Sequence, residues 1–176
     1  MDKRPIGIFD SGVGGMTVLA EIRKHFPNED LIYLGDTKNF PYGDKSKENI
    51  IKLATKCAGY LISKDVKLII IACGTATSQA LEELKKIYRL PIEGIISPTV
   101  EDISKSDNNK IGVIATEGTI KSNKWEEELK KEMLPEFFDI TGLIKALAGL
   151  VTAKANLEMS VRLSQGRKSS ANCQRD

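Results

Sequence analysis

The sequence predicts an α/β protein with an open, mainly parallel sheet flanked by helices. Short β-branched and apolar runs alternate with longer segments of helical period. The run at residues 68–72 is apolar on both faces, as a central strand covered by helices on each side requires. The length of 176 residues fits one ordinary domain, or one lobe and part of a second.

The expected elements follow one another in strand and helix pairs. A further strand is expected to end at Ile95 and Ile96, and residues 137–140 are expected to form another. Residues 143–163 carry a loose helical pattern, and residues 162–176 are too polar and charged to be buried, which predicts a frayed tail. The other expected strands are 6–9, 31–34, 68–72 and 111–114, and the other expected helices are 16–26, 47–62, 78–88 and 120–133.

These elements predict three regions along the chain. We expect a first α/β lobe at residues 1–96, a partial second lobe at 97–140, and a helix with a polar tail at 141–176.

The 26 basic and 24 acidic residues give a net charge of +2, which argues against nucleic acid or an anionic membrane as a partner. A small-molecule partner is therefore expected.

The cysteines and the single histidine limit the kinds of site. Cys57, Cys73 and Cys173 are an odd number at irregular spacing, which argues against a disulfide framework and indicates a reducing cytoplasm. Neither they nor His25 show the spacing of a metal site, so no metal is expected. No signal peptide and no apolar run of transmembrane length is visible.

Polar residues follow the predicted strands, where ligands bind in an open α/β sheet. Asp10 and Ser11 follow the first strand, and Cys73 follows the most apolar one. Asp10 is interpreted either as a cap for the following turn or as a base or orienting group near the thiol. Cys73 is interpreted either as a small buried hydrophobic residue or as a thiol whose thiolate form is favoured by a helix N-terminus. Cys57 is expected to pack in the core.

The glycine-rich turn at residues 12–15 has two interpretations. It suits an anion held by backbone N–H groups, and it equally suits a tight strand-to-helix turn. Thr17 occupies the third glycine position of a dinucleotide fingerprint, and no phosphate loop of an ATP site is present. NAD and ATP are therefore disfavoured as cofactors.

Five motifs together resemble glutamate racemases. They are Asp10-Ser11-Gly12-Val13-Gly14-Gly15, Pro41-Tyr42-Gly43, Ala72-Cys73-Gly74-Thr75-Ala76, Ile111-Gly112-Val113-Ile114 and Gly118-Thr119-Ile120. The resemblance covers residues 6–125 and implies a two-lobed α/β enzyme that uses neither pyridoxal phosphate nor metal. It implies interconversion of L- and D-glutamate for peptidoglycan synthesis, by two cysteines that face opposite sides of Cα.

The resemblance also implies roles for individual residues. Cys73 is implied as one catalytic cysteine, with Asp10 assisting it. The implied substrate-binding residues are Asp10, Ser11, Tyr42, Gly43, Gly74 and Thr75.

The sequence departs from that family in two places. Gly74 stands where the family has asparagine, and the family's second motif, glycine-cysteine-threonine-histidine, has no match. Cys173 lacks those neighbours, so its role is not carried over. We expect a truncated, frameshifted or wrongly spliced product whose exposed apolar surface leads to aggregation, a homodimer or dye binding. The alternatives are an aspartate or hydantoin racemase, and a non-catalytic remnant that binds an amino acid or a racemase subunit.

Overall fold

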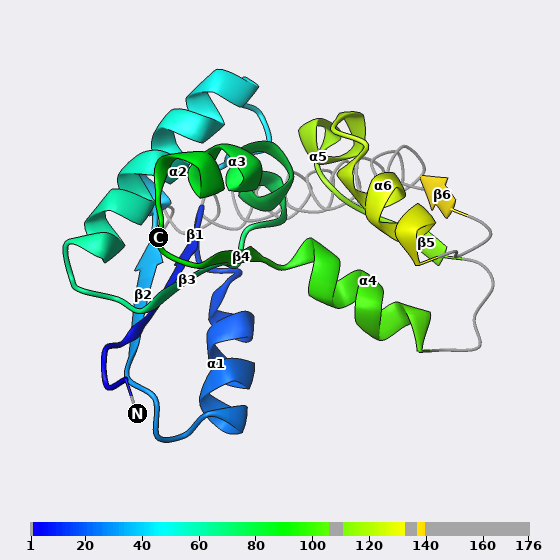
Figure 1. Ribbon diagram of the computed structural model, residues 1–176. Coiled ribbons are helices and arrows are strands. Elements are labelled where there is room, and N and C mark those ends of the chain that lie inside the picture. The colour runs from blue at the N-terminus through cyan, green and yellow to red at the C-terminus, as the bar shows by residue number, and fades with distance from the viewer. Residues whose placement is uncertain (1, 106–110, 133–136, 140–176) are drawn as a thin grey trace, which may run out of the picture. The chain divides into compact units, whose positions relative to one another are not determined.

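The computed structural model describes residues 2–105, 111–132 and 137–139 (Figure 1). These residues fall within one compact unit, Met1–Asp139. Within the described residues, no helix combines the length and the apolar character that a membrane span needs. The predicted helix at 143–163, the predicted tail and Cys173 lie outside the described residues.

Two parallel sheets confirm the predicted fold class. The first sheet has the strand order β2-β1-β3-β4, and the second pairs β5 with β6. All pairs are parallel, and helices connect strands of the first sheet that follow one another along the chain. The strands are β1 (Ile6–Asp10), β2 (Leu31–Gly35), β3 (Leu68–Ile71), β4 (Ile92–Gly94), β5 (Ile111–Val113) and β6 (Phe137–Asp139).

Helices cover both faces of the first sheet (Figure 1). α2 (Lys47–Ile62) and α3 (Gly74–Ile87) enclose the larger cluster of buried residues, which contains Phe9 of β1. Ile8, the preceding residue, belongs to the cluster beneath α1 (Met16–His25). Successive side chains of β1 therefore face opposite helical layers, as a buried parallel strand requires.

The predicted strand ending at Ile95 and Ile96 is wrong. The strand at this point is β4, which ends at Gly94, and Ile96 begins the helix α4 (Ile96–Ser104). Ile96 and Val100 are both buried and pack with Val113 of β5. Their spacing of four residues is a helical one, but two adjacent isoleucines alone do not distinguish a strand from a helix.

The predicted helix at 120–133 is two helices. α5 (Glu117–Lys121) and α6 (Lys124–Lys131) are separated at Asn123, whose φ of 56° is left-handed. Asparagine tolerates this conformation better than most residues, so it interrupts the helical hydrogen bonding. The boundary predicted between residues 96 and 97 stays a prediction.

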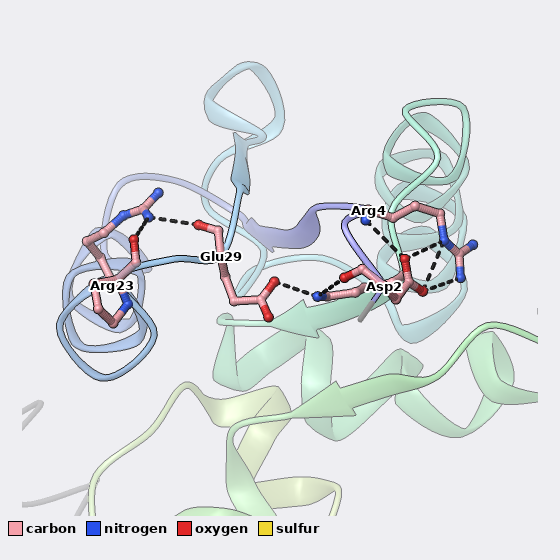
Figure 2. Close-up of polar contacts among 6 residues, drawn as sticks. Asp2, Arg4, Arg23 and Glu29 are labelled. Carbon is pink, nitrogen blue, oxygen red and sulfur yellow. Dashed lines mark hydrogen bonds and ion pairs between the residues drawn. The ribbon is translucent and has the colours of Figure 1, made fainter.

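A polar network joins the segments at the amino ends of the first three strands (Figure 2). Lys67 Nζ donates to the carboxylate of Glu29 and to the backbone oxygen of Asp2. Arg23 donates to the backbone oxygen of Glu29 at 2.7 Å. Lys67 directly precedes β3, so this network stabilises the edge of the sheet opposite to Cys73.

Candidate active site at the carboxyl edge of the first sheet

The pairing of β1 with β3 brings Asp10 and Cys73 to the same edge. Phe9 is in register with Ile71, so the residues that follow these two positions emerge side by side. Asp10, Ser11 and Cys73 are all buried, with exposed fractions of 6%, 9% and 6%. The predicted proximity of the carboxylate and the thiol is therefore confirmed.

The glycine-rich turn wraps around the carboxylate of Asp10. The backbone N–H of Ser11 donates to Oδ1 at 2.8 Å, and that of Gly15 donates to Oδ2 at 2.8 Å. A Cβ at Gly15 would lie 2.7 Å from Asp10 Cβ and 2.9 Å from Ala72 Cβ, so only glycine fits there. The anion held by the N–H groups of Ser11 and of Gly15, the last residue of this turn, is thus the side chain of Asp10.

Cys73 lies at the N-cap of α3. The backbone N–H of Ala76 donates to Cys73 Sγ at 3.4 Å, and the thiol donates to Ser11 Oγ at 3.4 Å. Ser11 Oγ lies 3.5 Å from Asp10 Oδ1. A thiol, a hydroxyl and a carboxylate therefore form one series of contacts, and the N-terminus of α3 places partial positive charge beside the sulfur.

Tyr42 is oriented into the core rather than along the edge. Its side chain is 1% exposed, and its hydroxyl donates to Asp36 Oδ2 at 2.8 Å. Burial, with this hydrogen bond, raises the pKa of Tyr42 well above its ordinary range. The tyrosine ring therefore does not line the open edge of the sheet, and its hydroxyl is already bonded to Asp36.

Cys57 lies beneath Tyr42 in the core, as predicted. Its Sγ is 3.8 Å from the tyrosine hydroxyl, and it belongs to the large buried cluster. Burial raises the pKa of the Cys57 thiol to about 11. At neutral pH this thiol is therefore protonated, which separates it chemically from an acid/base role.

Gly43 and Thr75 both lie beside Thr116, a residue to which the sequence motifs assign no individual role. Thr116, the N-cap of α5, lies 3.0 Å from Thr75 through their Oγ1 atoms. A Cβ at Gly43 would lie 2.6 Å from Thr116 Cγ2. Thr116 follows the strand expected at residues 111–114, and this position is the signal in the sequence that indicates a role for it at the edge of the sheet.

Gly74 lies in the first turn of α3, directly after Cys73. A Cβ at this position would meet no atom within 4 Å. Neither packing nor backbone conformation therefore requires glycine here, which contrasts with Gly15 and Gly43.

No cluster of three or more histidine, cysteine, aspartate or glutamate side chains suited to a metal ion occurs in the described part of the chain. His25 ends α1, where its Nδ1 lies 2.9 Å from the backbone oxygen of Glu21. A pocket of about 490 Å³ lies elsewhere, between α1 and α4, and its lining includes Val18, Ile70 and Pro98.

Comparison of the sequence identifies curated relatives. Residues 16–163 match the family model described as Asp/Glu/Hydantoin racemase. The chain is 51% identical to glutamate racemase from Aquifex aeolicus (strain VF5) over 127 residues, which cover 72% of the chain and 50% of that relative. It is 42% identical to glutamate racemase from Limosilactobacillus reuteri, over 86% of the chain and 56% of that protein. The chain spans about half the length of the curated relatives it matches.

Solved structures show the same similarity. Glutamate racemase from Aquifex pyrophilus matches with a TM-score of 0.72 and 48% identity, over 76% of this chain and 53% of that one. The enzyme from Francisella tularensis in complex with D-glutamate matches with a TM-score of 0.72 and 40% identity, over 79% and 53%. Since the family model covers most of the sequence, the chain belongs to the Asp/Glu/Hydantoin racemase family.

Proposed function

We propose that this chain carries the proton-transfer chemistry of a glutamate racemase, with Cys73 as the acid/base group at Cα of glutamate. The observation that carries the proposal is the placement of Cys73 Sγ between the Ala76 N–H and Ser11 Oγ, each at 3.4 Å. The curated relatives are named glutamate racemases. A thiol suits this reaction because both of its protonation states are accessible near neutral pH when its surroundings favour the thiolate.

Asp10 is proposed to orient the thiol through Ser11. Its carboxylate is fixed by two backbone N–H groups at 2.8 Å and contacts the Ser11 hydroxyl. In this arrangement the carboxylate holds the hydroxyl, and the hydroxyl in turn holds the sulfur. Asp10 thus keeps the thiol in a reactive geometry through Ser11, and it does not itself remove the substrate proton.

The substrate is proposed to lie against Ser11, Tyr42, Gly43, Gly74 and Thr75. Since the Tyr42 side chain is buried and its hydroxyl is bonded to Asp36, Tyr42 is proposed to contribute its backbone. Gly74 contributes a backbone N–H at the start of α3, where a carboxylate is favoured.

Inversion needs a second acid/base group on the other face of Cα. The sequence contains three cysteines, and none lies in a glycine-cysteine-threonine-histidine stretch. We therefore propose that the 176-residue chain removes the Cα proton from one face of L-glutamate and returns a solvent-derived proton to the same face. In a racemase with both thiols, the second thiol returns the proton to the opposite face and gives D-glutamate, the proposed supply for peptidoglycan synthesis in the cytoplasm.

Deuterium exchange tests the proposal directly. The purified chain is incubated with L-glutamate in D2O, and deuteration at Cα is followed together with chirality. Deuterated L-glutamate is the expected product, and Cys73→Ala is expected to abolish its formation. Deuterated D-glutamate would reveal a second acid/base group, and an absence of exchange would support the non-catalytic remnant.

The other two cysteines provide matched controls. Cys57→Ala removes a thiol that is buried beneath Tyr42 and is expected to leave exchange within about twofold of the wild-type rate. If Cys173→Ala abolishes any D-glutamate formed, Cys173 is the second thiol.

A parallel reaction with L-aspartate tests whether the chain has the substrate specificity of a glutamate racemase or of an aspartate racemase. A homodimer stays a prediction, which sedimentation of the purified chain checks.

A further inference from the structure

Thr116 contacts two of the segments proposed to bind the substrate. Its Oγ1 lies 3.0 Å from Thr75 Oγ1 at the start of α3 and 2.9 Å from Thr119 Oγ1. Thr75 and Thr119 are buried, with exposed fractions of 6% and 2%. The three hydroxyls therefore form one cluster that joins α3 to α5.

The methyl group of Thr116 packs against the turn that contains Gly43. A Cβ at Gly43 would lie 2.6 Å from Thr116 Cγ2 and 3.0 Å from Thr116 Cβ. Real Cβ atoms are not found at the shorter of these separations, so the turn approaches Thr116 this closely only because residue 43 is glycine. One side chain thus touches the turn through its methyl group and α3 through its hydroxyl.

A second contact holds α5 in the same place. Gln79 Nε2, on α3, donates to the backbone oxygen of Gly118. α5 is thereby fixed to α3 independently of the threonine hydroxyls. Thr116 itself is exposed at the surface, so its side chain does not fill the core, and replacing it does not open a cavity there.

We propose that Thr116 is a positioning residue that sets the separation between Gly43 and Thr75, and so the width of the glutamate site. The inference rests on the proposed function, because Gly43 and Thr75 are substrate-binding residues only within it. Thr116 acts through these two residues and takes no part in proton transfer. Its loss therefore weakens glutamate binding and leaves the rate at saturating glutamate unchanged.

The hydroxyl is tested by an isosteric change. Thr116→Val keeps both branches of the side chain but removes the hydrogen bond to Thr75. It also removes the contacts of Oγ1 with the Thr119 hydroxyl and backbone N–H, but the bond to Thr75 is the one that reaches a proposed substrate-binding residue. The glutamate concentration for half-maximal Cα exchange is therefore expected to rise about fivefold, with the saturated rate held within about twofold. Thr99→Val is the matched control, because Thr99 is an exposed threonine on α4 whose hydroxyl donates to the backbone oxygen of Ile95, the N-cap residue of that helix.

The methyl group is tested by a double substitution. Gly43→Ala is expected to weaken glutamate binding about tenfold or more, because its Cβ would displace Thr116 or the turn. Thr116→Ser removes the Cγ2 atom that this Cβ would meet and keeps the hydroxyl. The double variant is therefore expected to bind glutamate several-fold more tightly than Gly43→Ala alone, a coupling that a double-mutant cycle measures.

The outcomes separate the inference from the proposed function. Weaker binding in Thr116→Val, together with rescue of Gly43→Ala by Thr116→Ser, supports the positioning role. Normal binding in Thr116→Val with additive effects in the double variant overturns that role and leaves the proposed function intact. A fall in the saturated rate alone also overturns it. A wild-type chain that neither binds glutamate, as followed by NMR titration, nor exchanges its Cα proton overturns both.

Discussion

Cys73 Sγ lies 3.4 Å from Ser11 Oγ, although 62 residues separate them in the sequence. The parallel register of β1 and β3 produces this contact, since Phe9 and Ile71 are paired at the ends of the two strands. The serine hydroxyl in turn lies next to a carboxylate that the following turn holds in place. The site therefore depends on sheet register at least as much as on the identity of the cysteine.

Ser11→Ala is expected to lower Cα exchange about fivefold to tenfold, because it removes the hydroxyl between the thiol and the carboxylate. The free energy of unfolding is expected to change by about 1 kcal/mol or less. Ser63→Ala is the control, since Ser63 is exposed and its hydroxyl donates to the backbone oxygen of Tyr60 at 2.6 Å. An unchanged exchange rate in Ser11→Ala would contradict the proposed orienting path.

Gly74→Asn is expected to bind glutamate more tightly, by about tenfold if the new amide reaches a charged group of the substrate. Because a Cβ at Gly74 meets no atom within 4 Å, the stability of the fold is expected to be unchanged or to rise by about 0.5 kcal/mol, since glycine disfavours helices.

The control for this substitution is Gly15→Ala, whose Cβ would lie 2.7 Å from Asp10 Cβ. That variant is expected to lose about 1–3 kcal/mol in denaturant unfolding. Equal losses in the two variants would contradict the packing difference between these glycines.

The stability of the chain is expected to fall as the pH rises from about 9 to about 11. Burial raises the pKa of Cys57 to about 11 from its ordinary value of 9.0. In this window the unfolded chain loses the thiol proton while the folded chain keeps it. The stabilisation is complete below pH 9 and is lost as the pH rises through the folded value.

The slope of this loss approaches a tenfold change in the unfolding equilibrium constant per pH unit for one proton. Cys57→Ala is expected to show a shallower loss between pH 9 and 11, in urea titrations at fixed pH values. Parallel curves for the wild-type chain and the variant would show that Cys57 is not the group responsible.

Lys67→Met is expected to destabilise the fold by about 1–2 kcal/mol, because it leaves the carboxylate of Glu29 partly buried without its cation. The side chains of this pair are 17% and 25% exposed. Lys86→Met breaks an exposed pair with Glu83 and is expected to cost less than about 0.5 kcal/mol. Since Lys67 lies at the edge opposite to Cys73, Cα exchange at a temperature where both variants are folded is expected to be normal.

The amino-acid sequence by itself determined the fold class and the position of Cys73. Apolar runs such as the one at residues 68–72 identify buried parallel strands, because only strands covered on both faces are apolar throughout. The residue after such a strand lies at the edge where ligands bind. Asp10 and Cys73 followed from this rule, and the core position of Cys57 followed from its place among the apolar residues of α2.

Tertiary structure alone decided the remaining features of the site. Two adjacent isoleucines suit a strand and a helix equally well, and Ile96 is helical because it packs with Val113 from a distant strand. The inward orientation of Tyr42 depends on Asp36 and Cys57, and the contacts of Thr116 with Gly43 and Thr75 join segments that are far apart in sequence. Local periodicity reports which residues are buried, whereas these contacts depend on which segments the folded backbone brings together.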